Sequence, residues 1–124
     1  AAIFLARKGN SKKDIRNYIE KKFDYDLKRR LKDIIPEYSF DVSCQGSVPE
    51  AILCFLEAND FTESIRLAVS LGGDADTQAC IAGAIAHAYY QEIPKYMVEQ
   101  SKTILDNKLW GILEAFHEVY QVPI

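Results

Sequence analysis

Apolar residues along the chain recur at intervals of three and four positions, which is the spacing of one face of an α-helix. Ile15, Tyr18, Ile19 and Phe23 follow this spacing. Alternation with a period of two is never sustained, and runs of β-branched residues are short. The pattern therefore predicts an all-α fold, a multi-helix orthogonal bundle.

Capping residues, glycines and prolines divide this pattern into separate helices. Ser47 and Glu50 have the spacing of a capping box, with Pro49 in the first helical turn. The preceding stretch, residues 36–47, is rich in polar and turn residues and is expected to be a loop. We expect helices over approximately residues 1–8, 11–22, 26–35, 47–59, 60–71, 75–90, 94–106 and 107–120.

Residues 79–90 form the most apolar of these segments, because small and apolar side chains occupy nearly all sides of the predicted helix. A helix of this kind is typically central and buried. Its row Ala75, Ala79, Gly83 and His87 has i, i+4 spacing, and the small members of that row favour close approach of other helices. The bundle is therefore expected to surround a helix at about residues 75–90.

Length and charge indicate a single domain and make nucleic-acid binding and membrane insertion less favoured. The chain has 124 residues, the size of a single domain, and a net charge of −3. Residues 7–32 carry eleven lysines and arginines against four acidic residues. Such a segment is typical of a solvated helix face, and less typical of a nucleic-acid interface, because no aromatic residues are interleaved for stacking. No apolar run approaches the roughly 20 residues of a membrane span, so we expect no membrane insertion.

The three cysteines, Cys44, Cys54 and Cys80, include no Cys-x-x-Cys pair, which argues against a structural zinc site. Cys54 and Cys80 have apolar neighbours and are expected in the core. We predict a reducing, cytoplasmic location. His87 and His117 lack ligand spacing and are expected to be packed or partly exposed side chains.

Candidate chemistry concentrates where the small-residue helix begins. Gly72 and Gly73 precede Asp74, Asp76 and Thr77. One interpretation is that the carboxylates only cap the helix, where negative charge is favourable. The other is that a hard cation such as Mg²⁺, Mn²⁺ or Ca²⁺ relieves the repulsion between two carboxylates, since such cations take oxygen ligands. The residues that follow do not supply the ligands of an EF-hand loop.

Five motifs together resemble the C-terminal part of the ADP-ribosylglycohydrolase family, which contains the dinitrogenase reductase-activating glycohydrolase. The resemblance covers about residues 40–120. In order, the motifs are SVPEAI at 47–52, AVSLGGDADT at 68–77, IAGAIA at 81–86, AYY at 88–90 and IP at 93–94.

The resemblance implies an all-helical fold with two divalent metals, Mg²⁺ or Mn²⁺, and removal of ADP-ribose from modified side chains. It implies that Asp74, Asp76 and Thr77 bind metal and that Gly72 and Gly73 keep the turn slim beside a ligand. It also suggests that Gly46 and Ser47 face the ADP-ribose cleft.

The sequence departs from the family pattern at His87, at Gln91 and above all in length. Family members carry further metal-binding residues, and the acidic residues assigned to catalysis, in an N-terminal half. Residues 1–70 contain no Thr-Asp-Asp element, so we assign no catalytic residue. We predict the C-terminal part of a hydrolase, inactive by itself. The alternatives are a non-catalytic helical module that pairs with another chain or copy, and a nucleic-acid-binding protein.

Overall fold

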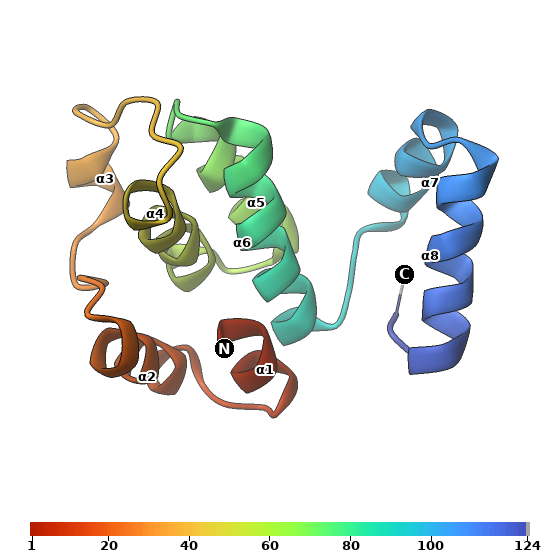
Figure 1. The fold of residues 1–124 in the computed structure, drawn as a ribbon, viewed down its shortest axis with the longest axis horizontal. Helices are drawn as coiled ribbons and strands as arrows, with labels where there is room; N and C mark the ends of the chain where they lie inside the picture. Colours follow the sequence, from red (N-terminus) through yellow and green to blue (C-terminus); the bar gives the residue numbers. More distant parts are fainter. Residues whose placement is uncertain (124) are drawn as a thin grey trace. The chain divides into compact units, whose positions relative to one another are not determined.

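The computed structural model describes residues 1–123 and confirms the predicted all-α class (Figure 1). Residues 1–123 contain no β-strand. The helices are α1 (Ala2–Arg7), α2 (Lys12–Phe23), α3 (Leu31–Ile34), α4 (Cys44–Glu57), α5 (Phe61–Ser70), α6 (Ala75–Tyr90), α7 (Lys95–Ile104) and α8 (Asn107–Tyr120).

The chain forms two compact units. Unit 1 comprises Ala1–Tyr90 and contains α1–α6 together with every residue of the hydrophobic core found in the described part of the chain. Unit 2 comprises Gln91–Ile124 and contains α7 and α8, neither of which has a buried residue. Most of the large apolar side chains of α8 are exposed, and Trp110 is partly buried. None of the described helices is both long enough and apolar enough to span a membrane.

Helix α6 is the centre of unit 1, as predicted, and packs against α5, α4 and α1. Gly83 shows why this helix needs small residues. A Cβ atom at position 83 would lie 2.7 Å from Cδ1 of Ile65 in α5, closer than van der Waals contact allows. The prediction that α6 is buried on nearly all sides is wrong for one face, because Cys80 and Ala84 are exposed.

Ser11 begins α2 with a capping box, as its position after Gly9 indicates. The hydroxyl of Ser11 accepts from the amide of Asp14, and the Asp14 carboxylate accepts from the amide of Ser11 at 3.3 Å. Gly9 has a φ of +77°, a conformation that glycine adopts without steric cost and that ends α1. The entry into α2 was therefore predictable from local chemistry.

The predicted helix from Tyr25 or Asp26 is mostly absent, and α3 covers only four residues. Side chains take the backbone amides that a helix would use: the Glu20 carboxylate accepts from the amide of Leu27, and the Asp26 carboxylate accepts from the amide of Lys28. Such bonds compete with helix formation. This segment is therefore held in an irregular conformation by acidic side chains, one from α2 and one of its own.

The predicted start of α4 is also wrong. The helix begins at Cys44, and its N-cap is Ser43, whose hydroxyl accepts from the amide of Gly46 at 3.0 Å. Ser47 therefore lies inside the helix, as does Pro49, and the proposed Ser47–Glu50 capping box does not form. The glycine at position 46 hides this earlier start from a propensity argument.

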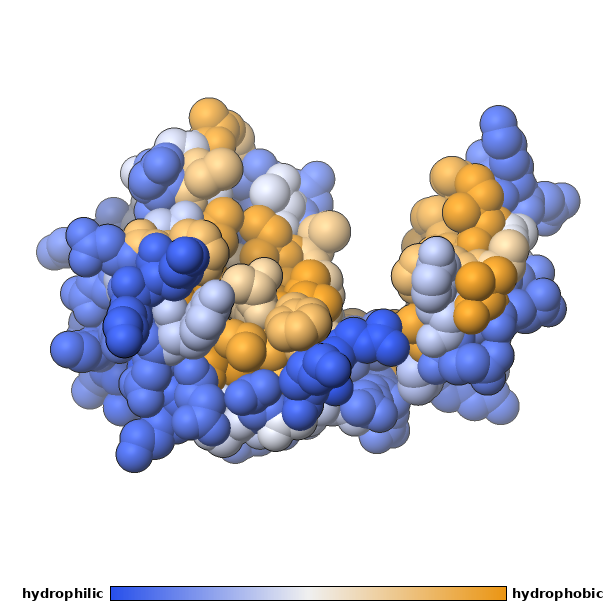
Figure 2. Space-filling model, turned by 60° about the horizontal axis from the view of Figure 1, so that its bottom comes forward, coloured by the Kyte–Doolittle hydropathy of each residue, from blue (hydrophilic) through white to orange (hydrophobic). Residues whose placement is uncertain are grey.

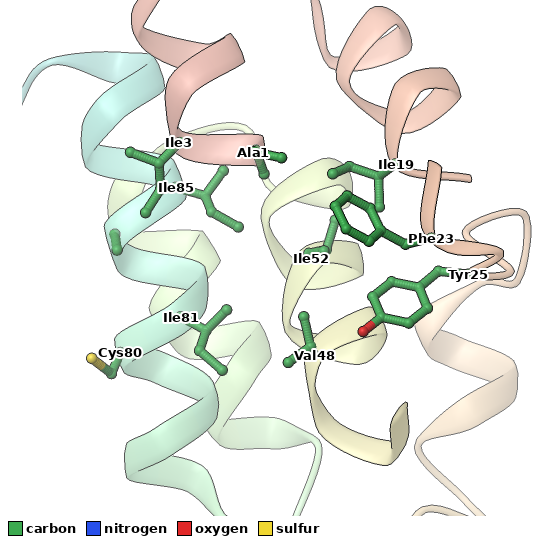
Figure 3. A pocket seen from close by; sticks show the side chains of 12 residues that line it. Ala1, Ile3, Ile19, Phe23, Tyr25, Val48, Ile52, Cys80, Ile81 and Ile85 are labelled. Carbon is green, nitrogen blue, oxygen red and sulfur yellow. The ribbon is translucent and has the colours of Figure 1, made fainter. Parts of the chain in front are cut away.

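Apolar residues gather over a broad area of one face of unit 1 (Figure 2). Part of that unit is an apolar groove of about 380 Å³ between α1, α2, α4 and α6. In Figure 3, Ile81 and Ile85 of α6 point toward Val48 and Ile52 of α4. Cys80 lies at the edge of the groove, so the prediction that it is a core residue is wrong, whereas Cys54 is fully buried as predicted.

Candidate metal-binding turn

The acidic turn lies between α5 and α6 and opens onto solvent. Gly72 has a φ of +79°, which reverses the chain after α5. Asp74 directly precedes α6, and its carbonyl accepts from the amide of Gln78 at 2.9 Å. Asp76 and Thr77 are exposed in the first turn of the helix. The three predicted metal ligands are thus close together along one turn and accessible.

Asp74 and Asp76 are two positions apart where α6 begins. A hydrogen bond with the Asp74 side chain is the largest cause that lowers the pKa of Asp76, and a hydrogen bond from the backbone amide of Thr77 adds to it. The Thr77 bond measures 2.9 Å. Neighbouring carboxylates repel each other, and a bound proton or cation relieves that repulsion. The pair is therefore suited to a divalent cation.

The donor set fits an oxygen-preferring metal such as Mg²⁺ or Mn²⁺, but only in part. Carboxylate and hydroxyl oxygens are the ligands these ions prefer. No group of three or more histidine, cysteine, aspartate or glutamate side chains in residues 1–123 could hold a metal ion. The turn supplies two carboxylates, Asp74 and Asp76, and one hydroxyl, Thr77, so other ligands must complete the coordination.

Beneath this turn lies Tyr38, a residue that the sequence did not single out. Its hydroxyl donates to the carbonyl of Gly46 at 2.7 Å and accepts from the side-chain amide of Gln78 at 2.6 Å. Its ring occupies the space beside Gly73, where a Cβ atom would lie 2.5 Å from Cε1 of the ring. Tyr38 therefore links the first turns of α4 and α6, and explains why position 73 is glycine.

The two predicted ligand-binding residues of α4 lie near the start of that helix. Gly46 is the acceptor for Tyr38, and a Cβ atom at position 46 would clash with the carboxylate of Asp41. Ser47 is 5% exposed, and its hydroxyl donates to the carbonyl of Ser43 at 2.6 Å. The roles of Gly46 and Ser47 in ligand binding stay predictions.

Tyr38 also lines a second cavity, of about 400 Å³. Its buried acid is Glu50, whose Oε1 pairs with Nη2 of Arg29 at 2.8 Å while Oε2 has no hydrogen-bond partner in residues 1–123. Burial is the main cause that raises the pKa of Tyr38, and the charge of Glu50 raises it further. The Tyr38 hydroxyl therefore stays protonated and able to donate at neutral pH.

The aromatic and amide residues around the turn could not be found from spacing. Tyr38 precedes Gln78 by forty positions and lies in a segment expected to be a loop. Gln78 follows the acidic motif and looks like an ordinary polar helix residue. The only local signal is the pair Gly72 and Gly73. Two glycines indicate that another group approaches the backbone closely, but not which residue it belongs to.

Comparison with known proteins identifies the family of this chain. A model of the family described as ADP-ribosylglycohydrolase matches residues 4–123. The chain belongs to the ADP-ribosylglycohydrolase family. The match extends the resemblance beyond residues 40–120, because it also includes most of α1 and all of α2 and α3, which carry no recognisable motif.

Individual members of the ADP-ribosylglycohydrolase family are similar to this chain at a moderate level. ADP-ribosylhydrolase ARH3 of Mus musculus is 30% identical over 111 residues, covering 79% of this chain and 29% of that protein. ADP-ribosylhydrolase ARH3 of Xenopus tropicalis is 33% identical over 102 residues, covering 72% of this chain and 29% of that protein. The chain therefore spans less than a third of the length of these relatives. No solved structure matches it significantly.

Proposed function

We propose that this chain supplies one side of a divalent-metal site in an ADP-ribosylglycohydrolase, which cleaves the N- or O-glycosidic bond of ADP-ribosylated substrates. Membership of the family supports the reaction class. The observation that supports the metal assignment is the placement of two carboxylates, Asp74 and Asp76, and the hydroxyl of Thr77 within four residues at the accessible start of α6. The ion we propose is Mg²⁺ or Mn²⁺, and the substrate is a protein or small molecule that bears ADP-ribose.

In this proposal each residue of the turn has a distinct role. Asp74 and Asp76 provide negative charge, Thr77 adds a neutral oxygen, and Gly72 and Gly73 leave room for a ligand against the backbone. A bound cation supplies Lewis-acid stabilisation and orients the groups that react at the glycosidic carbon. The opposite ligands and the acidic catalytic residues would come from other parts of a complete family member.

The proposal predicts weak metal binding by the chain alone. Titration calorimetry with Mn²⁺ should detect binding to the wild-type chain and none to Asp76→Ala. The matched control is Asp106→Ala, because Asp106 also caps a helix, with its carboxylate accepting from the amide of Leu109, but it belongs to α8. Equal affinity in the wild type and Asp76→Ala would refute the metal assignment.

The proposal also predicts negligible hydrolysis by the isolated 124-residue chain. Three oxygen ligands on one turn leave most of a metal's coordination shell to water, and two carboxylates alone do not complete a catalytic site. The measurement is release of ADP-ribose from serine- and arginine-ADP-ribosylated peptides in the presence of Mg²⁺. Robust metal-dependent release by the purified chain would overturn the view that its site is incomplete.

We also propose a reducing, cytoplasmic setting, which the free thiols of Cys44, Cys54 and Cys80 support. The basic segment of residues 7–32 adds little support for nucleic-acid binding. Lys12, Arg29 and Arg30 of that segment make hydrogen bonds or ion pairs within unit 1. Pairing of the chain with a second copy is a weaker alternative, because no observation favours it over the family's chemistry.

A further inference from the structure

We propose that Gln78 is an additional member of the metal-binding turn, and that Tyr38 fixes its side-chain amide so that the oxygen, not the nitrogen, faces the turn. The inference rests on the proposed function, because it assumes that Asp74 and Asp76 hold a cation. It assigns Gln78 Oε1 as the acceptor for a metal-bound water, and Tyr38 as the residue that positions it.

The first step is the direction of the hydrogen bonds around Tyr38. A phenol has one hydrogen, and Tyr38 uses it toward the carbonyl of Gly46, which can only accept. The Tyr38 oxygen, 2.6 Å from the amide of Gln78, must then accept. Only the nitrogen of a glutamine amide donates, so Nε2 must face Tyr38.

The second step follows from the geometry of the amide. With Nε2 held by Tyr38, Oε1 of Gln78 points to the other side, and it lies 3.3 Å from the position that a Cβ atom of residue 73 would take. Turning the amide over would place two oxygen acceptors against each other. The Tyr38–Gln78 pair therefore presents a carbonyl oxygen to the underside of the Gly73–Asp74 turn.

The third step is that this oxygen has nothing to bind. Gln78 is completely buried, and Oε1 has no hydrogen-bond partner in residues 1–123. Buried acceptors in native proteins are normally satisfied by protein or by ordered water. Residues that orient metal ligands or metal-bound waters are typical of such positions, immediately behind the ligands themselves.

The glycine at position 73 also supports this role for Gln78. Any larger residue would press on the Tyr38 ring and on Gln78 Oε1 at once. Because glycine has no side chain, no side-chain atom of residue 73 lies between that oxygen and the backbone of the turn. Residues 73–78 thus combine two carboxylates that can bind a metal, Asp74 and Asp76, with one buried, uncharged hydrogen-bond acceptor, Gln78 Oε1.

The experiment compares Mn²⁺ affinity among variants of the full chain, with Mn²⁺ alone as the probe. Gln78→Met keeps the side-chain volume and removes the oxygen, and Tyr38→Phe keeps the ring and removes the hydroxyl. The control is Ser64→Ala in α5, which removes another completely buried hydrogen-bonding group, one that donates to the carbonyl of the N-cap residue Asp60. Free Mn²⁺ is measured by electron paramagnetic resonance, and folding by circular dichroism.

We expect Gln78→Met to weaken Mn²⁺ binding by about tenfold, the usual effect of losing a residue behind the metal ligands. Tyr38→Phe should weaken it in the same direction, and Ser64→Ala should leave it within about twofold. If the wild type binds Mn²⁺ and Asp76→Ala does not, but both Gln78→Met and Tyr38→Phe bind normally, this inference is wrong and the proposed metal site stands.

Two other results also decide the matter. If the wild type fails to bind Mn²⁺, or binds it no better than Asp76→Ala, the metal site and this inference fall together. If Gln78→Met does not fold, Tyr38→Phe decides. Unchanged Mn²⁺ affinity in a folded Tyr38→Phe chain overturns the positioning role, and reduced affinity supports it.

Discussion

Lys12 shows how far a single side chain can depart from the role its pattern indicates. Its position on α2 predicts a solvated lysine, yet its ammonium donates to the carbonyls of Phe55 and Ala58 at the end of α4. The same ammonium lies over the rings of Phe55, at 4.9 Å from the ring centre, and Tyr90. A cation at this end of a helix offsets the negative end of its dipole. Burial is the main cause that lowers the pKa of Lys12.

Tyr90, next to this lysine, should make the stability of unit 1 fall as the pH becomes alkaline. Burial raises its pKa to about 12, and its hydroxyl donates to the carbonyl of Ala58 at 3.0 Å. Because the folded state keeps the phenol proton longer than the unfolded state, its stabilising contribution is present below about pH 10 and lost as the pH rises toward about 12.

Urea unfolding followed by circular dichroism measures the effect of Tyr90→Phe. This variant should lose about 0.5–1.5 kcal/mol near neutral pH, where the wild type keeps its hydrogen bond. The difference should shrink between about pH 10 and about pH 12. Tyr18→Phe, at an exposed position, is the control. A constant difference between Tyr90→Phe and the wild type at every pH would contradict the expectation.

The three thiols should differ in reactivity. Cys54 is completely buried, and burial raises its pKa to about 12, whereas Cys44 and Cys80 are exposed. Because the thiolate is the reacting form, Ellman's reagent at about pH 8 should titrate two thiols rapidly and the third only after unfolding. Cys54→Ala should remove the slow thiol alone. Three thiols that react at one rate in the folded chain would be inconsistent with this core.

At the level of elements, the close contact between α5 and α6 depends on Gly83. Gly83→Leu forces the new side chain against Ile65, and overpacking of this kind costs about 1–3 kcal/mol. Ala84→Leu changes the next residue of the same helix, which is exposed, and should cost far less. Thermal melting of both variants tests the expectation. Equal melting temperatures for the two variants would show that α5 and α6 tolerate a wider separation.

The element boundaries show which parts of the fold could be predicted from sequence. Helix α2 and helix α5 follow from Ser11 and Asp60, because each cap bonds an amide three residues later in the same chain segment. The segment before α3 was mispredicted, since Glu20 and Asp26 satisfy amides there through side chains. Some local caps can therefore be predicted, although the Ser43 cap of α4 was missed, whereas the bond between Glu20 and the amide of Leu27, seven positions away, cannot.

Some residues of the candidate site could also be predicted from the sequence, and others could not. Asp74, Asp76 and Thr77 are contiguous, so their chemistry was visible in the sequence. Tyr38, which lies between α3 and α4, meets Gln78 of α6 only in the folded chain, and no sequence spacing indicates that contact. Pairing of Glu50 with Arg29 is likewise a product of tertiary structure.

At the level of the whole molecule, unit 1 carries the stability. Every core residue in the described part of the chain lies within residues 1–90, and neither α7 nor α8 contains a buried residue. A chain that ends at Tyr90 should therefore fold, with a melting temperature within a few degrees of the full chain. Circular dichroism of the two chains makes the comparison. An unfolded 1–90 chain would show that residues beyond Tyr90 stabilise unit 1 by more than their burial indicates.

The reactivity of the Cys80 thiol can report whether the apolar groove is covered. Its thiol lies at the groove's edge, while the thiol of Cys44 is exposed at the start of α4 and does not line the groove. The ratio of their alkylation rates, read by mass spectrometry, reports whether anything covers the groove, since any change in reagent concentration affects both thiols equally. The same ratio of alkylation rates can be compared between dilute solution and intact cells, because the protein needs no label before the reaction.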